Sequence, residues 1–382
     1  LGTVVVRAAI HVDPRDGHVT VVSDPIPNML NARGKDGIDN GFLLLVREVQ
    51  VNVDRPGFML NPTNCAPMEI GATIGAVPGQ TVTAASRLQM ADCSALGLDP
   101  KLALTLSGKG QTTDGKHPAV SAVLTQAAGE SNLKKVKVTL PLSLALDTDN
   151  AESDGLCSFV EGSKDDPKCP ASSVVGTATA VTPILNEPLT GPVYFVKNVR
   201  KDPKSGREIR TLPKLVIPLR GNGILLTLTG TSDVVNDRLV TTFDLIPDAP
   251  VSSFKLNITG GKKGILVISG DKADICKANQ IANQEVDGQN GKQADTDITI
   301  ATPACKTKVI SKKTTKKSVV VKVAGLTAGK LTITGKGIKK TSRTITKATV
   351  ATITARRTKG TPGKVKVTLK PVGKAKARTA AA

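Results

Sequence analysis

The chain has 382 residues, of which 39% are hydrophobic, so it can form several cores and is too long for one small domain. It contains no Trp, one Tyr and six Phe, but 35 Gly and 23 Pro. Cores must therefore be built from Val, Ile, Leu and Ala, a composition that favours β-strands joined by tight turns. No apolar run reaches the roughly 18–20 residues that a membrane helix needs, so the sequence predicts no membrane-spanning helix.

The net charge of +20 is concentrated at one end. Residues 306–382 contain 22 Lys and Arg and no acidic residue, which leaves 30 basic and 32 acidic residues in 1–305, a net of −2. We therefore expect a nearly neutral body joined to a strongly basic end.

Residues 1–95 predict a first β-sandwich module. Strands are expected at 4–6, 19–23 and 49–53, the last with the polar alternation of a half-buried strand. The polar stretch 31–40 predicts a loop. Cys65 and Cys93 stand near the end of the module.

Residues 96–220 predict a second module of a different type. Its expected strands lie at the following positions: 102–106, 119–125, 136–140, 174–181, 193–196 and 215–217. Cys157 and Cys169 close a short acidic loop between two of them.

Residues 221–305 repeat the order of 1–95. The apolar run 224–228, a turn at 236–237 and the stretch 239–247 correspond to 4–6, 16–17 and 19–27, and a pair of cysteines again ends the unit. We therefore predict a second copy of the first module, bounded by residues 221 and 305.

Residues 306–382 predict a basic immunoglobulin-like β domain. Alternating strands at 318–323, 330–334 and 364–369 are separated by Gly and Lys-Gly turns. We expect 373–382 to be a frayed tail. The predicted fold is thus all-β, a tandem of immunoglobulin-like or jelly-roll-like sandwich modules stapled by disulfides.

The six cysteines form three pairs that are close in sequence, namely Cys65 and Cys93, Cys157 and Cys169, and Cys276 and Cys305. One local pair per module indicates three disulfides and an oxidising compartment. Structural zinc is disfavoured because no cysteine or histidine spacing typical of zinc ligands occurs.

Chemistry-bearing motifs are weak. Gly-rich turns lie between strands with no helix after them, so they do not predict a phosphate-binding loop. His117 is expected in a solvated loop. Asp147 and Asp149 resemble the start of a calcium loop but lack its later ligands, and they are the carboxylates of the least favoured hypothesis, a polysaccharide-active enzyme. We expect no catalytic, cofactor or metal site.

The basic region offers candidates for contact with an anionic partner or a neighbouring subunit. They are Lys312, Lys313, Lys316, Lys317, Lys339, Lys340, Arg356 and Arg357. Nucleic acid is disfavoured because 306–382 has no aromatic residue on which a base could stack. The alternatives are an anionic envelope polymer, the acidic face of another subunit, and lysines that only protect strand edges.

Several phrases resemble those of large repetitive secreted proteins of actinobacteria. They are DRPGFMLNPTNCAPM at 54–68, CPASSVVG at 169–176, LTGPVY at 189–194, PDAPVS at 247–252 and GQNGK at 288–292. The resemblance implies arrays of such modules, export to a surface or extracellular site, and a further module before Leu1. It implies no activity.

The sequence therefore favours a secreted structural protein that self-assembles, as a homo-oligomer or a polymer, into an extracellular filament or surface layer. A nearly neutral body and a basic end can attract each other head to tail, and an open sheet edge can accept a strand. The alternative is an adhesin or envelope-binding protein whose basic domain docks on anionic polymer.

Overall fold

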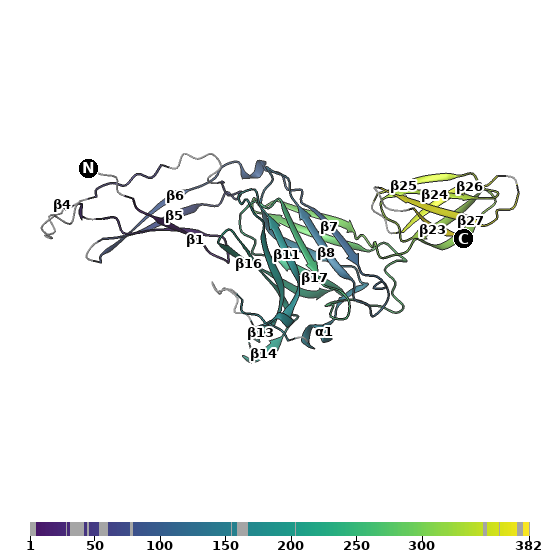
Figure 1. The fold of residues 1–382 in the computed structure, drawn as a ribbon, viewed down its shortest axis with the longest axis horizontal. Helices are drawn as coiled ribbons and strands as arrows, with labels where there is room; N and C mark the ends of the chain where they lie inside the picture. Colours follow the sequence, from purple (N-terminus) through teal and green to yellow (C-terminus); the bar gives the residue numbers. More distant parts are fainter. Residues whose placement is uncertain are drawn as a thin grey trace, which may run out of the picture.

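The computed structural model describes residues 5–27, 29–30, 42–43, 46–52, 60–76, 79–153, 155–158, 167–202, 204–346, 350–358, 360–372 and 377–381. The predicted loop 31–40 and most of the acidic loop between Cys157 and Cys169 lie outside these residues. The described chain is nearly all β. Figure 1 shows an N-terminal arm, a central body and a C-terminal domain in a row.

One eleven-stranded antiparallel sheet builds the central body. Its strands, in spatial order, are β21 (Gln293–Thr299), β20 (Ile281–Gly288), β9 (Leu133–Thr139), β17 (Arg238–Phe243), β16 (Ile224–Val235), β15 (Lys214–Gly221), β12 (Leu189–Val196), β11 (Val174–Val181), β18 (Ser253–Ile258), β8 (Ala119–Thr125) and β7 (Lys101–Ser107). The predicted turn at Asn236 and Asp237 joins β16 to β17, and both residues have the positive φ of a two-residue hairpin turn.

The sheet curls until its two ends meet. The backbone N–H of Leu106 in β7 donates to the carbonyl oxygen of Ala301, and the N–H of Ala301 donates to Leu104, both at 2.8 Å. Aliphatic side chains fill the enclosed space, among them the fully buried Ile217 and Ile268. The core thus lies inside one folded-over sheet.

This topology corrects the predicted boundary between residues 220 and 221. Strand β9 from the second predicted module lies between β17 and β20 from the third, and β18 lies between β8 and β11. Residues 96–305 are therefore one body. The sequence repeat marks related segments, but the hydrogen bonds of a sheet decide which segments fold together.

Glycine permits two close strand approaches in this sheet. A Cβ on Gly191 of β12 would lie 2.0 Å from the carbonyl oxygen of Pro218, and one on Gly176 of β11 would lie 2.0 Å from that of Asn257. Both glycines belong to the phrases on which the family resemblance depends, so part of that resemblance has a packing reason.

The N-terminal arm consists of separate hairpins. They are β1 (Ala8–Val12) with β2 (Val19–Ser23), β3 (Met29–Leu30) with β4 (Phe42–Leu43), and β5 (Met68–Gly75) with β6 (Thr81–Leu88). The strand predicted at 49–53 is wrong over its described part, because residues 49–52 are exposed and belong to no strand. Over its described residues the arm thus contains separate hairpins and no sandwich.

Small elements complete the body. Strand β10 (Leu144–Leu146) pairs with β19 (Leu266–Ile268), and β13 (Val199–Lys201) with β14 (Glu208–Arg210). In the part of the chain that the structure describes, the helical elements are η1 (Cys93–Ala95), α1 (Thr148–Ser153) and η2 (Ala171–Ser173).

The C-terminal domain is an immunoglobulin-like sandwich. One sheet contains β22 (Lys308–Thr314), β23 (Ser318–Ala324) and β26 (Val350–Arg356); the other contains β25 (Thr341–Ile345), β24 (Gly329–Gly335), β27 (Val365–Pro371) and β28 (Arg378–Ala381). Its core of Val, Ile, Leu and Ala is buried between them. The predicted frayed tail is wrong for 378–381, because β28 pairs with β27.

We predict that Ile217→Ala lowers the free energy of unfolding of residues 96–305 as one unit, by about 2–5 kcal/mol, because Ile217 is fully buried in the shared core. Scanning calorimetry measures this. Ile333→Ala in the C-terminal core is the matched control and should lower only the transition of that domain. Separate transitions for 96–220 and 221–305 would contradict a single body.

Candidate interaction surfaces

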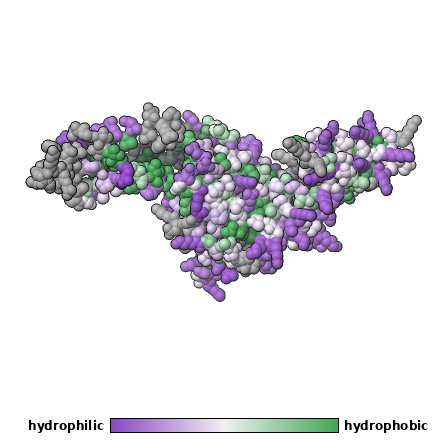
Figure 2. Space-filling view, viewed as in Figure 1, coloured by the Kyte–Doolittle hydropathy of each residue, from purple (hydrophilic) through white to green (hydrophobic). Residues whose placement is uncertain are grey.

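The N-terminal arm presents exposed apolar side chains on its hairpins. We call this set the open face; it comprises Ile10, Val19, Val21, Ile70, Ile74 and Val82, all more than half exposed. Figure 2 shows hydrophobic side chains gathered on the arm. Apolar patches of this kind on a soluble protein mark contact sites.

The open face coincides with open sheet edges. Within the described residues, β1, β2, β5 and β6 each pair only with the other strand of their own hairpin. An isolated two-stranded hairpin is at best marginally stable in water. The unpaired N–H and C=O groups at the edge of such a hairpin are a template for another strand.

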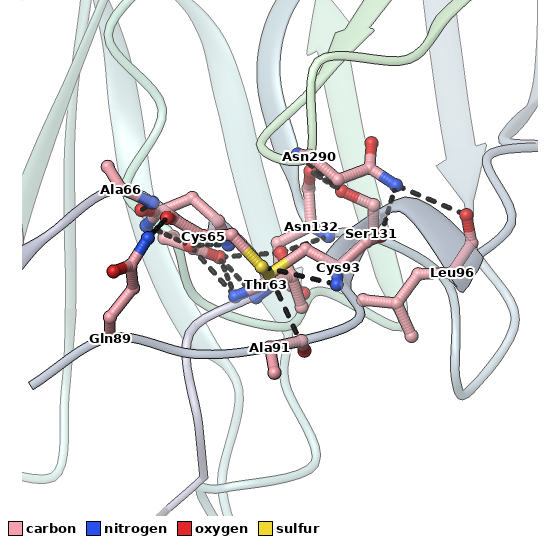
Figure 3. Close-up of a disulfide and its surroundings, with 12 residues drawn as sticks. Thr63, Cys65, Ala66, Gln89, Ala91, Cys93, Leu96, Ser131, Asn132 and Asn290 are labelled. Carbon is pink, nitrogen blue, oxygen red and sulfur yellow. Dashed lines mark hydrogen bonds between the residues drawn. A yellow bond between two sulfur atoms is a disulfide. The ribbon is translucent and has the colours of Figure 1, made fainter.

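A disulfide closes the arm beside the central body. Cys65 is bonded to Cys93, and the hairpin β5–β6 lies between them in sequence. Figure 3 shows the surroundings of this bond, where the amide of Asn290 donates to the carbonyl oxygens of Cys93 and Leu96 at 2.9 and 3.1 Å. The arm is thus attached to the turn between β20 and β21.

One carboxylate holds this joint from the body side. Asp248 accepts hydrogen bonds from the backbone N–H of Thr63 at 2.9 Å and of Asn64 at 3.0 Å. Its oxygens also accept from the side chains of Thr63, Asn64 and Asn132 at 2.7–2.8 Å. A charged acceptor with this many donors is a strong anchor.

The electrostatics of Asp248 follow from this geometry. Burial raises the pKa of its carboxyl, but the hydrogen bonds from Asn64, Asn132 and Thr63 outweigh burial and hold the pKa below its usual range. The side chain is therefore ionised at neutral pH, in the form that accepts all of these bonds.

The structure brings together two residues that the sequence treats separately. His117 Nε2 lies 2.6 Å from Asp147 Oδ2, and the two side chains are only 17% and 21% exposed. The prediction of a solvated His117 is therefore wrong. Asp147 Oδ1 also accepts the N–H of Asn150 in α1, so the carboxylate caps that helix.

The pKa of Asp147 reflects this capping role. Burial raises it, and the hydrogen bonds from Asn150 and His117 lower it further than burial raises it. The side chain of Asp149 is exposed, and its backbone hydrogen bond to Asp147 lowers the pKa of Asp147 as well. Among the described residues, no group of three or more His, Cys, Asp or Glu side chains gathers as metal ligands would.

A second surface is the basic tip of the C-terminal domain. The N–H of Arg357 donates to the carbonyl of Lys317 at 2.9 Å, and the N–H of Lys339 donates to that of Arg356 at 2.8 Å. These contacts collect Lys316, Lys317, Lys339, Lys340, Arg356 and Arg357 at one end of the sandwich, which we name the basic tip. Lys312 and Lys313 precede it on β22 and are exposed.

The basic tip lies away from the central body. The opposite end of the sandwich makes the joint, where the N–H of Val350 donates to Asn279 at 2.8 Å and Lys308 Nζ lies 3.1 Å from Asp274. Strand β26 runs from Val350 to Arg356, a length of about 20 Å at the usual rise per residue. The cations of the tip are therefore free of the joint.

Comparison with known proteins leaves the family open. No protein-family model and no curated protein matches the chain. Among solved structures, it matches BcpA, the major pilin subunit of Bacillus cereus, at 9% identity and a TM-score of 0.25, over 92% of this chain and 73% of that one. It matches dimeric latent PorU from Porphyromonas gingivalis at 10% identity and a TM-score of 0.16, over 78% of this chain and 35% of that one. At these TM-scores neither likeness bears on function.

Two observations bear on the compartment. The predicted pairs are bonded, since Cys157 joins Cys169 and Cys276 joins Cys305 as Cys65 joins Cys93. Disulfides persist in oxidising surroundings, so the three bonds are consistent with an extracellular protein. In the described part of the chain, no helix has the length and apolar character to cross a membrane.

We predict that Asp248→Ala loosens the joint and increases the range of arm positions seen by small-angle X-ray scattering. In the native chain the carboxylate stabilises the joint fully above the ordinary aspartate pKa of about 3.9. Because its pKa is lowered in the folded joint, this contribution falls as the pH drops below that value. Asp237→Ala, in an exposed turn, is the control; equal loosening by both changes would contradict the anchor.

Proposed function

We propose that this chain is a secreted structural protein that assembles through β contacts into an extracellular filament or surface layer. The open face of the N-terminal arm carries the proposal, because it joins exposed apolar side chains to strand edges that have no partner in the described part of the chain. Edge-to-edge strand addition satisfies both features at once, by hydrogen bonding the backbone and burying the side chains.

The charge distribution supports directional assembly. The basic tip and the open face belong to opposite ends of a chain whose first 305 residues are nearly neutral. A contact between unlike ends propagates as an open filament unless its rotation closes a ring. Long-range attraction between unlike ends depends on ionic strength, because salt screens exposed charges.

A non-enzymatic role is part of the proposal. The acid–base pair that the structure assembles, His117 with Asp147, is used to cap α1 and to hold its loop. No hydroxyl or thiol nucleophile is hydrogen-bonded to His117 among the described residues. This arrangement supports a structural interpretation of the pair.

We predict that the purified chain forms higher oligomers as its concentration rises, seen by sedimentation velocity and electron microscopy. Ile70→Lys with Ile74→Lys should abolish them, because charged side chains on an edge prevent pairing. Both residues are exposed, so the change leaves the folded body intact. Leu142→Lys with Val372→Lys, two exposed apolar positions elsewhere, is the control. Monomers at all concentrations and salts would refute assembly.

The basic tip favours a second candidate function, an envelope-binding protein that docks on anionic polymer. Clustered cations with no acidic residue in the domain repel one another unless an anion lies between them. This candidate places the partner at the C-terminal end, whereas assembly through the open face uses the N-terminal end.

We predict that Lys316→Glu with Lys317→Glu weakens binding to immobilised polyphosphate at least about tenfold and lowers its salt dependence. Lys330→Glu with Lys370→Glu changes the charge equally; these two lysines face each other across β24 and β27, away from the basic tip. A loss of the same size in both variants would show that net charge alone binds the polymer.

A further inference from the structure

The two copies of the repeated segment can be aligned by the register of their last hairpins. In the hairpin β5–β6, the paired residues next to the turn are Gly75 and Thr81. In the hairpin β20–β21, they are Asp287 and Gln293. This match places Ile70 and Ile74 where the second copy has Ala282 and Val286. A cysteine pair brackets both hairpins.

Burial separates the copies at these matched positions. Ala282 and Val286 are 0% and 2% exposed, whereas Ile70 and Ile74 are 64% and 60% exposed. In the first copy the larger side chains, Ile70 and Ile74, thus lie on the surface. In the second copy the smaller side chains, Ala282 and Val286, lie in the core. The difference comes from what covers them, since both hairpins are antiparallel and closed by a disulfide.

The segment 96–220 provides the cover in the second copy. Strand β9 lies between β17 and β20, β15 pairs with β16, and β18 lies between β8 and β11. In the first copy, the strands that match β17 and β20 are β2 and β5, and neither has a partner outside its hairpin within the described residues.

A third element shows the same dependence. Residues 49–52 correspond to β18, which becomes a strand between β8 and β11. Without such neighbours, residues 49–52 form no strand, and Val49 and Val51 are exposed. Their alternating apolar and polar pattern is that of a half-buried strand. Such a strand needs neighbouring strands and a layer that covers its apolar side chains.

We propose that the open face is the docking site of a β segment of the 96–220 type, whose β9-like strand inserts between β2 and β5. The inference rests on the proposed function, because it names the partner that the assembly surface accepts. The second copy supplies the register. A residue equivalent to Val138 lies opposite Val21 and Ala72, since Val138 lies opposite Thr241 and Gln284.

The register also predicts how the inserted strand differs from β9. Lys137 forms an ion pair with Glu285 at 2.8 Å. The first copy has Thr73 at the position that matches Glu285. A strand adapted to the open face therefore needs no cation at this position.

The test adds a copy of residues 96–220 in front of Leu1 of the full chain. This position follows from the fold, because β15 leads into β16 through the two-residue turn Asn222–Gly223. Hydrogen exchange then measures the amides of β5 and β6. We expect their exchange to slow at least about 100-fold, from the range of frayed hairpins toward that of a core sheet.

The matched control carries Val136→Pro and Val138→Pro in the added segment only, which removes two backbone donors from its β9-like strand. Exchange in β5 and β6 should then stay fast, while 96–305 serves as the internal reference. Unchanged exchange on adding the unmodified segment would overturn the proposal. Concentration-dependent protection of β5 and β6 that persists unchanged when the segment is added would overturn it too, because another occupant then holds the open face.

A cross-link tests the register independently. Val21→Cys in the arm and Val138→Cys in the added segment should form a disulfide, because directly opposed residues lie within disulfide distance. Val21→Cys with Leu133→Cys in the added segment lies five residues out of register and should not. Cross-linking of both pairs alike would refute the inserted strand.

The two proposals fail separately. If the unextended chain assembles but the added segment gives neither protection nor a cross-link, the open face is an assembly surface with another occupant. If the added segment protects the arm but the unextended chain never assembles, the docking proposal is supported and the proposal of a filament is refuted.

Discussion

The fold depends on the backbone hydrogen bonds that strand β9 makes on both of its edges. On one side it pairs with β17 and on the other with β20, so a segment from one part of the sequence holds together two strands of another. Every buried N–H and C=O group needs a partner, and this constraint makes 96–220 and 221–305 one body. The first copy of the repeat, where no strand plays this part within the described residues, has its hairpins exposed.

Polar contacts, in contrast, set the joints between the folded parts. At the N-terminal joint the carboxylate of Asp248 gathers donors from Thr63, Asn64 and Asn132. At the C-terminal joint Lys308 and Asp274 form an ion pair. Charged hydrogen bonds are directional, so a few of them orient one folded part against the next. The chain thus uses apolar burial inside each part and polar anchors between parts.

The sequence was sufficient for features that depend on neighbouring residues. Strand positions such as 119–125, the turn at Asn236 and Asp237, and the cysteine pairs are local patterns, and the structure has them. It was insufficient for features that depend on a contact with a residue far away in the chain. The contact of His117 with Asp147, 30 residues apart, leaves no local pattern, and the pairing of β28 depends on β27. Similarity between 1–95 and 221–305 indicates common construction, but it does not reveal which of them is covered.

Hydrophobicity alone does not explain why the C-terminal domain is complete and the arm is not. Both are built from aliphatic side chains, and the arm contains as strong a run of Val and Ile as β23 does. The C-terminal domain has two sheets that face each other and bury Val321, Ile333 and Val367 between them. A sheet with one apolar face needs a second layer, and large aromatic side chains, which can cover a thin sheet, are nearly absent from this chain. The C-terminal domain builds this second layer from its own strands, whereas residues 221–305 obtain their cover from the strands of 96–220 that share their sheet.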